Sequence, residues 1–405
     1  MTDPRDSCDI LIVGAGPAGT SAAIHLAKQG IRVLLLEQTK FPRAKLCGEF
    51  ISPECQKHFD QLGVANPMLE ARGATLNQTI FYSQTGRSVT VPTEWFGNNA
   101  TALGLSRAEM DMRLLDRAKS LGVRVLEDTH VSEPIVDRKR VRGVRLKSNG
   151  HVHDYSSRMT IDATGRTRAL ARKFDGWSMS GETKRRPHLV AFKAHLKDTR
   201  GARGVCEIYS YQGGYGGLNE VEGGVSNFCF IVSAETVRLN NSDPETVIRN
   251  TVFKNPRAAH TLADSKRSTD WLSVSLERFG RHKLVPIDGL LTIGDAAAFI
   301  DPFTGSGMLM ALESGKLVAQ TIIEHFEAAT TTNSFAMLAN DYRSRYHQKF
   351  DSRLRICGLL RRVAFSPWLA EAAILIFGTS ARLRHKVARA TRPSLERKAS
   401  ASRDA

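Results

Sequence analysis

The sequence contains few cysteines, and none are paired at metal-binding spacing. Its six cysteines lie at positions 8, 47, 55, 206, 229 and 357, with no Cys-x-x-Cys pair and no histidine cluster. This scatter argues against a zinc site and against a disulfide framework. Because unpaired thiols are typical of a reducing compartment, we expect a cytoplasmic protein.

Long hydrophobic stretches are also missing. No apolar run reaches the roughly 18 residues that a helix needs to span a bilayer. The N-terminus enters a strand almost at once and lacks the basic region and apolar core of a signal peptide. The sequence therefore predicts neither a membrane-spanning helix nor a secretion signal.

The charge balance is basic. The chain carries 57 Lys and Arg against 41 Asp and Glu, a formal net charge of +16 over 405 residues. In the basic cluster 137–147 the charges alternate with Val and Leu, which is typical of the solvated face of a strand, so we expect no nucleic-acid partner. A phosphate-bearing cofactor, an acidic carrier or an anionic membrane surface remain open.

Residues 8–38 follow the order strand, glycine turn, helix and strand. Gly14, Gly16 and Gly19 form a Gly-x-Gly-x-x-Gly motif that permits a tight turn, a close approach of backbone to a pyrophosphate, and close packing of helix on strand. The helix N-terminus would hold the phosphates. Glu37 ends the second strand, where a carboxylate can accept both ribose hydroxyls. This pattern predicts a bound dinucleotide, either NAD or FAD.

Two later segments favour FAD. Residues 156–174 read as a short strand that ends in Asp-Ala-Thr-Gly, and residues 290–326 read as a strand, a Gly-Asp turn, a loop and a long helix. Asp295 in that turn can accept a hydrogen bond from a ribityl chain. The amides from Gly305 to Met308, at the helix N-terminus, can stabilise negative charge on a reduced flavin.

With these three motifs in order, residues 8–330 resemble the FAD-dependent glutathione-reductase-like superfamily, in the branch of geranylgeranyl reductases and aromatic-ring flavin monooxygenases. The resemblance implies an α/β fold: a Rossmann-like FAD-binding domain, an interleaved β-sheet substrate domain and a C-terminal helical segment. It also implies that Arg107, which opens a helix, reaches the FAD phosphates or ribose. The backbone of Val131 would contact adenine.

The implied fold divides the chain into discontinuous parts. We expect an FAD-binding domain at 1–74, 100–180 and 281–330, a substrate domain at 75–99 and 181–280, C-terminal helices at 331–392 and a disordered tail at 393–405. Strands are expected within 75–92, 188–196, 204–233 and 271–277. Their aromatic side chains either face the flavin or pack in a core, namely Phe81, Tyr82, Tyr209, Tyr211, Tyr215, Phe228 and Phe230.

The loop 41–54 resembles the Lys-x-Cys-Gly-Gly loop of geranylgeranyl reductases, except that Glu49 replaces the last glycine. Arg43 and Lys45 would neutralise phosphate, and Gly48 would let the backbone pass close to the flavin ring. Cys47 is the candidate catalytic residue, able to protonate a reduced substrate, with simple packing as the alternative. No metal ligand is expected. The expected FAD contacts are Gly14, Gly16, Ala18, Gly19, Glu37, Lys45, Cys47, Gly48, Arg107, Val131, Asp295, Gly305, Gly307 and Met308.

Three functions remain open. The first, which the sequence favours, is an NAD(P)H-using monooxygenase that hydroxylates a hydrophobic, aromatic or polyketide-like molecule. The hydroxylase loop after Gly-Asp usually has a histidine and two prolines, whereas this chain has Ala298 and a single Pro302. The second is saturation of C=C bonds in a prenyl or lipid chain. The Lys-x-Cys-Gly loop favours this function, whereas the family's Tyr-x-Trp-x-Phe-Pro motif keeps only Tyr215. The third is a non-catalytic prenyl-binding chaperone.

The sequence also indicates how the flavin is reduced and excludes one reaction. Because it has one dinucleotide fingerprint, NADPH or NADH would dock transiently as reductant, or another carrier would reduce the flavin. The Trp-x-Trp-x-Ile-Pro motif of flavin halogenases is absent, so we expect no halogenation. The oligomeric state is left open.

The C-terminal region from Ser334 onward reads as helices. The second of these has an apolar stretch from Trp368 to Phe377, followed by basic residues. Such a helix could make a peripheral contact with an anionic membrane, or it could cap the substrate cavity. The basic residues are Arg382, Arg384, Lys386, Arg389 and Arg392.

Overall fold

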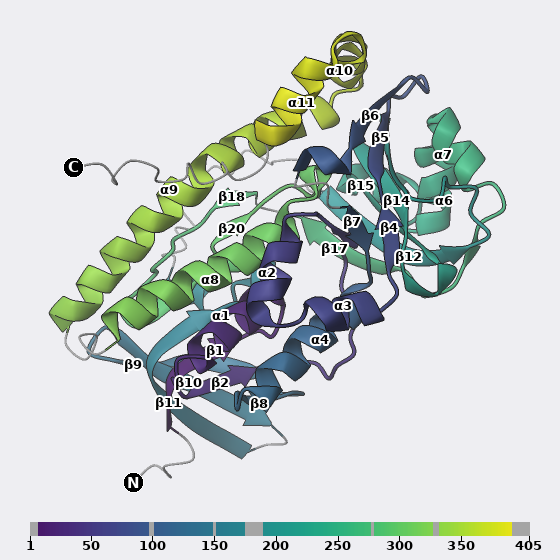
Figure 1. The fold of residues 1–405 in the computed structure, drawn as a ribbon. Coiled ribbons are helices and arrows are strands. Elements are labelled where there is room, and N and C mark those ends of the chain that lie inside the picture. The colour runs from purple at the N-terminus through teal and green to yellow at the C-terminus, as the bar shows by residue number, and fades with distance from the viewer. Residues whose placement is uncertain are drawn as a thin grey trace, which may run out of the picture.

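The computed structural model describes residues 7–96, 101–148, 151–174, 189–276, 279–326 and 332–390 (Figure 1). Arg392, the expected tail 393–405 and the expected domain boundaries near 99, 180 and 330 lie outside these ranges. The domain division therefore stays a prediction.

The N-terminal sheet is a seven-stranded, mostly parallel sheet. Its order is β8-β2-β1-β11-β10-β9, with β19 paired to β11. β1, β2, β8, β11 and β19 run parallel, so their carboxyl ends meet at one edge, where α/β proteins form cofactor crevices. The strands are β1 (Ser7–Val13), β2 (Val33–Leu36), β8 (Arg124–Leu126), β9 (Val131–Asp137), β10 (Arg140–Ser148), β11 (His151–Asp162) and β19 (Leu290–Thr292).

Two helices that are distant in sequence pack closely on this sheet. α1 (Pro17–Ala27) lies against α8 (Gly307–His325), and Ser21 Oγ donates to the Leu312 carbonyl at 2.9 Å. A Cβ placed on Gly315 would lie 2.4 Å from the Ala18 carbonyl oxygen. The helix pair therefore requires a glycine at position 315. Beside it lie α2 (Cys55–Leu62), α3 (Ala65–Glu70) and α4 (Arg107–Ser120).

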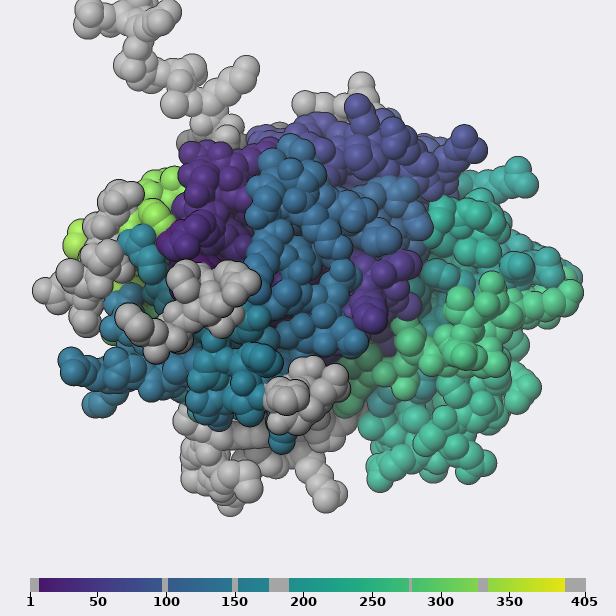
Figure 2. Space-filling view, turned by 90° about the horizontal axis from the view of Figure 1, so that it is seen from below, coloured from purple at the N-terminus to yellow at the C-terminus, as the bar shows by residue number. Residues whose placement is uncertain are grey.

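The second large sheet has eight strands in the order β16-β12-β15-β14-β13-β5-β6, with β17 paired to β12. One of its faces packs on a core shared with three short helices, α5 (Ala234–Leu239), α6 (Pro244–Asn250) and α7 (Pro256–Thr261). Seen from below, the teal to green segments gather at one end of the molecule, and purple to blue segments cover the other end (Figure 2). The strands are β5 (Gln78–Tyr82), β6 (Ser88–Pro92), β12 (Leu189–Lys197), β13 (Val205–Tyr211), β14 (Gly214–Glu220), β15 (Ser226–Ser233), β16 (Lys266–Arg267) and β17 (Leu272–Leu276).

Two small sheets complete the strands of the described residues. The first is built from β3 (Phe50–Ile51), β4 (Ala74–Leu76) and β7 (Ala102–Gly104), and the second from β18 (Gly280–Arg281) and β20 (Ala298–Phe299). The expected fold class, an α/β FAD-binding fold with an interleaved sheet and C-terminal helices, is confirmed.

Residues 332–390, the described part of the C-terminal segment, form three helices. α9 (Thr332–Ala364) runs beside α8, and α10 (Pro367–Thr379) and α11 (Ala381–Ala390) follow near β6 (Figure 1). The sequence suggested one helix after Pro367, but Ser380 is extended (φ −140°, ψ 108°) and divides it. Gly378 is a weak helix former, and the Ser380 hydroxyl accepts a bond from the Leu383 amide at 3.2 Å, which caps α11. Among the described residues, no helix has the length and apolarity to cross a membrane.

The contact between α1 and α8 predicts the effect of adding one methyl group. Gly315→Ala should lower the free energy of unfolding by about 1–3 kcal/mol, because the methyl group is overpacked against the Ala18 carbonyl. Gly358→Ala in α9 is the matched control: a Cβ there meets nothing within 4 Å, so helix propensity should stabilise it by about 0.5–1 kcal/mol. Thermal and urea unfolding measure the stability of both variants. Equal changes in the free energy of unfolding for Gly315→Ala and Gly358→Ala would contradict the close contact at Gly315.

Candidate functional site

A cavity of about 690 Å³ joins the two sheets. Its wall includes the carboxyl-end loops of the N-terminal sheet, the face of β13–β15 and one side of α10 and α11. All but one of the expected FAD contacts line it, and Gly19 lies behind the wall. Those on the wall are Gly14, Gly16, Ala18, Glu37, Lys45, Cys47, Gly48, Arg107, Val131, Asp295, Gly305, Gly307 and Met308. Their contacts with a cofactor remain predictions.

The glycine turn is a tightly packed backbone cradle. Gly14 has φ +105°, and a Cβ there would lie 2.4 Å from the Ala163 carbonyl oxygen. A Cβ on Gly19 would lie 1.9 Å from the Gly14 carbonyl oxygen, so the first turn of α1 can sit directly on the turn only with glycine there. Gly16 instead faces the cavity.

Glu37 follows β2 and is buried. Its Oε2 accepts a hydrogen bond from the Ala15 amide at 2.9 Å, and its Oε1 accepts from the Thr39 hydroxyl at 2.9 Å. Arg43 donates to Oε2 at 3.3 Å. The carboxylate is therefore held at the edge of the glycine turn, where a ribose would lie.

Two guanidinium groups lie over the glycine turn. Arg107, the first residue of α4, forms a two-pronged ion pair with the buried Asp111, with N–O distances of 2.9 and 2.7 Å. Arg43 contacts Asp111 at 3.1 Å. A Cβ on Gly16 would lie 3.8 Å from Arg107 and 4.0 Å from Arg43. Asp111 is a site residue that the sequence reasoning missed, although its spacing four residues after Arg107 is a signal for an ion pair.

The cradle fits an anionic diphosphate. Arg43 is 8% exposed, yet its Nε has no hydrogen-bond partner among the described residues. A buried donor of this kind is costly unless a ligand accepts from it, and phosphate oxygens are suitable acceptors. The glycine cradle, Glu37 and the two arginines together fit the phosphate and ribose groups of FAD.

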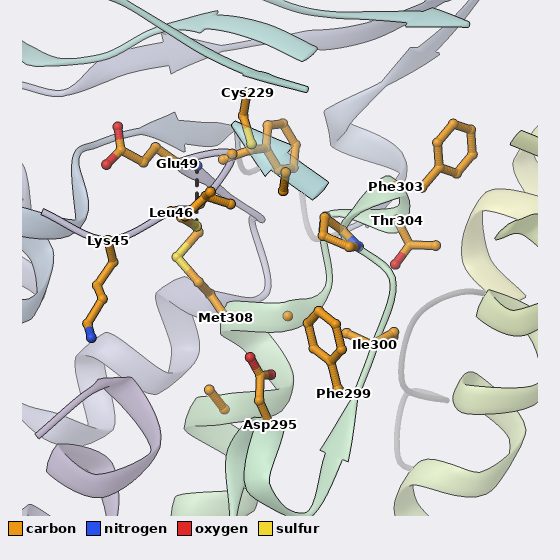
Figure 3. A pocket seen from close by; sticks show the side chains of 18 of the residues that line it. Lys45, Leu46, Glu49, Cys229, Asp295, Phe299, Ile300, Phe303, Thr304 and Met308 are labelled. Carbon is orange, nitrogen blue, oxygen red and sulfur yellow. Dashed lines mark hydrogen bonds between the residues drawn. The ribbon is translucent and has the colours of Figure 1, made fainter. Parts of the chain in front are cut away.

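Asp295 and the start of α8 form the opposite wall (Figure 3). Burial raises the pKa of the Asp295 carboxyl to about 6, although Arg166 and Arg107 act to lower it. Met308 lies in the first turn of α8, whose amides have no partners within the helix and so can donate to a ligand. This wall can therefore offer a carboxyl group and a helix N-terminus to a flavin.

The loop from Lys45 to Glu49 crosses the cavity between these walls. The Cys47 thiol accepts a hydrogen bond from the Glu49 amide at 3.4 Å, and Asn227 of β15 donates to the Cys47 carbonyl at 3.2 Å. Burial and the Arg43 guanidinium lower the pKa of the Lys45 ammonium. The loop is thus held to the second sheet.

Glu49 is the main residue that the sequence reasoning left without a role. Its fully buried carboxylate contacts Lys193 Nζ at 2.5 Å and His195 Nε2 at 2.7 Å, both on β12, and accepts from the Arg107 amide at 2.9 Å. Burial acts to raise the pKa of the carboxyl, but His195 and Lys193 outweigh it and hold the pKa below its usual range. In Figure 3 the carboxylate points away from Met308 and Asp295. Glu49 therefore holds the loop in place through its contacts with β12 and the start of α4.

The aromatic candidates separate by strand face. Phe81 and Tyr215 line the cavity. The other five aromatic residues pack in the core on the opposite face of the sheet; they are Tyr82, Tyr209, Tyr211, Phe228 and Phe230. The Tyr215 hydroxyl donates to Asp301 at 2.6 Å, and Arg361 contacts the same carboxylate at 3.3 Å. Burial raises the pKa of both Tyr215 and Asp301. Tyr215 is thus a cavity residue whose hydroxyl is held by a buried carboxyl group.

The raised pKa of Asp295 predicts a pH-dependent stability. The folded value of about 6 exceeds the ordinary 3.8, so ionised Asp295 destabilises the ligand-free protein fully above pH 6, and the effect disappears as the pH falls to 3.8. Asp295→Asn should therefore be the more stable protein at pH 7.5, by an amount that shrinks between pH 6 and 4. Urea unfolding of the ligand-free protein measures this, with the exposed Asp60→Asn as control. A variant no more stable than wild type at pH 7.5 would refute it.

Comparisons with known proteins agree with this geometry. The chain matches the FAD-binding domain family over residues 7–333. It is 28% identical to a menaquinone reductase of Mycolicibacterium smegmatis, over 77% of this chain and 75% of that protein. It is 26% identical to digeranylgeranylglycerophospholipid reductase 2 of Methanopyrus kandleri, over 84% of this chain and 83% of that protein.

A solved flavin-dependent brominase shares the fold, with a TM-score of 0.76, 20% identity and coverage of 95% and 93% of the two chains. At that identity the likeness bears on the fold alone. The match over residues 7–333 includes the glycine turn, the arginines and the Asp295 loop. The chain therefore belongs to the FAD-binding domain family and is an FAD-dependent oxidoreductase.

Proposed function

We propose that this oxidoreductase saturates C=C bonds in a prenyl or lipid chain, with NADPH or NADH as reductant. The observation that carries the proposal is the continuity of the cavity. It extends from the Cys47 loop and Asp295 to an apolar end beneath α10. The side chains of that end include Ile208, Ile231, Leu360, Val363, Ile374 and Phe377.

An apolar end suits an extended hydrocarbon. Apolar area removed from water stabilises a complex by about 25 cal/mol per Å², and no specific polar contact is required along the chain. The two curated relatives described above are both named reductases, and one name specifies a digeranylgeranyl lipid. These names support the reductase over the hydroxylase.

Saturation of one C=C bond requires a hydride at one carbon and a proton at the other. Bound FAD supplies hydride chemistry, so the protein must supply the proton. The Cys47 thiol lies on the cavity wall and accepts its bond from the Glu49 amide, which leaves the thiol proton to donate. We infer that Cys47 protonates the second carbon and that the resulting thiolate takes a proton from water.

The role of Cys47 predicts a selective loss of turnover. Cys47→Ala should retain FAD absorbance but reduce turnover by about 100-fold, the scale expected for a lost general acid. Cys8→Ala, a buried cysteine outside the cavity lining, is the control and should turn over normally. The rate is followed as NADPH oxidation with a prenylated substrate. Unchanged turnover in Cys47→Ala would assign Cys47 to packing.

A specific observation keeps hydroxylation as the second candidate. By the spacing from Tyr215, the Trp and Phe of the family motif would stand at Gly217 and Asn219, and both of these residues line the cavity. The wall there is wider and more polar than the motif would make it. That wall leaves room for a ring, as an aromatic or polyketide-like substrate would require.

The product separates the two reactions. With NADPH and a prenylated quinone or phospholipid, we expect a mass gain of two hydrogens per double bond, with turnover that persists without oxygen. A gain of one oxygen that occurs only in air would overturn the reductase in favour of hydroxylation. Reactions without enzyme and with enzyme stripped of FAD are the controls. The non-catalytic chaperone is set aside, because the chain belongs to an FAD-dependent enzyme family.

A further inference from the structure

α10 presents apolar side chains on two opposite faces. One face lines the cavity and includes Ala373, Ile374 and Phe377. The other face carries Trp368 and the pair Leu375–Ile376, at positions i, i+7 and i+8, and these are 71%, 49% and 55% exposed. A helix with apolar side chains on two opposite faces is normally covered on both of them. The outer face therefore lacks a covering layer within the described part of the chain.

Exposed apolar side chains are concentrated in this region. Ten large hydrophobic residues are exposed in the described chain, and five of them fall between residues 359 and 383. The other five are distributed from Leu69 to Met337. Single exposed residues are ordinary, but a cluster marks a contact surface.

The helices that flank this face are basic. α11 exposes Arg382, Lys386 and Arg389 on one helical face, and the end of α9 exposes Arg362. Between residues 352 and 390 the sequence has one acidic residue, Glu371. It turns toward β5 and β6, where it accepts from the Thr85 hydroxyl at 2.9 Å and contacts Arg87 at 3.5 Å. No acidic side chain of these helices therefore offsets the exposed cations.

We propose that α10 and α11 dock on an anionic lipid bilayer. Trp368, Leu375 and Ile376 enter the headgroup layer, and the cations of α11 contact anionic headgroups. Tryptophan beside aliphatic residues, flanked by Lys and Arg, is the composition of a helix lying in a membrane interface. A second copy of the chain fits poorly, because a symmetric contact would bring the same cations together.

The two faces of α10 would then connect the bilayer to the cavity. A helix is about 10 Å across, so Ile374 and Phe377 would lie one helix diameter from the lipid. A prenyl substrate could leave the bilayer and enter the cavity beside α10. This last step rests on the proposed function, whereas the docking itself does not.

Vesicle flotation of the full-length, FAD-loaded protein tests the docking. We expect binding to phosphatidylcholine vesicles that contain about 30 mol % phosphatidylglycerol, and weak binding to pure phosphatidylcholine. The double variant Trp368→Ser/Ile376→Ser should bind about tenfold more weakly or worse. Replacing Leu69 and Leu239, which are 66% and 77% exposed elsewhere, with Ser is the matched control and should leave binding unchanged.

The charge contribution has its own variant. Arg382→Gln/Lys386→Gln/Arg389→Gln should weaken binding to anionic vesicles and reduce its sensitivity to salt. FAD absorbance and Tm identify any variant that fails to fold, and such a variant is replaced by Leu375→Ser. Equal binding by the Trp368/Ile376 variant and wild type would overturn the proposal. So would a dimer in sedimentation that this variant dissociates.

Docking and the proposed reaction fail in distinguishable ways. Vesicle binding without reduction of any prenyl substrate would refute the reaction and leave the docking intact. Reduction of a detergent-solubilised prenyl substrate by a protein that does not bind vesicles would refute the docking alone.

Discussion

The buried carboxylate of Glu49 is the interaction on which the geometry of the site depends. It contacts Lys193 and His195 of β12 and the backbone amide of Arg107, so one side chain joins the loop, the second sheet and α4. A buried carboxylate without partners would be strongly destabilising, so these contacts are mutually required. Because Cys47 and Gly48 immediately precede Glu49, the same network fixes their position relative to the second sheet and α4.

Much of the cofactor side could be predicted from local sequence. The glycine turn, Glu37 and the Asp295 loop each lie within a short segment, where backbone geometry follows from neighbouring residues. The second strand expected within residues 8–38 is β2, which ends at Leu36, directly before Glu37. α8 begins at Gly307, within the expected loop and helix. Local motifs of this kind constrain the backbone and therefore transfer well from sequence.

The substrate side could not be predicted so fully, because its contacts are distant in sequence. Glu49 and Lys193 are 144 positions apart, so only the fold reveals their ion pair. Strand alternation places neighbouring aromatics on opposite faces, but Tyr215 reaches the cavity only through the order of the strands. The division of the last helix at Ser380 depends on a cap that a reading of the apolar pattern overlooked.

The contact between α1 and α8 also bears on how the protein is made. Ser21 and Leu312 are 291 positions apart, so α1 emerges from the ribosome long before the helix that covers it. At about 5–20 residues per second, the interval is about 15–60 s. During that time the apolar side of the glycine-turn helix lacks its final neighbour, and the cofactor cradle is complete only when about three quarters of the chain has been synthesised. Contacts between residues so distant in sequence generally slow folding, and apolar surface left uncovered during synthesis is what chaperones bind.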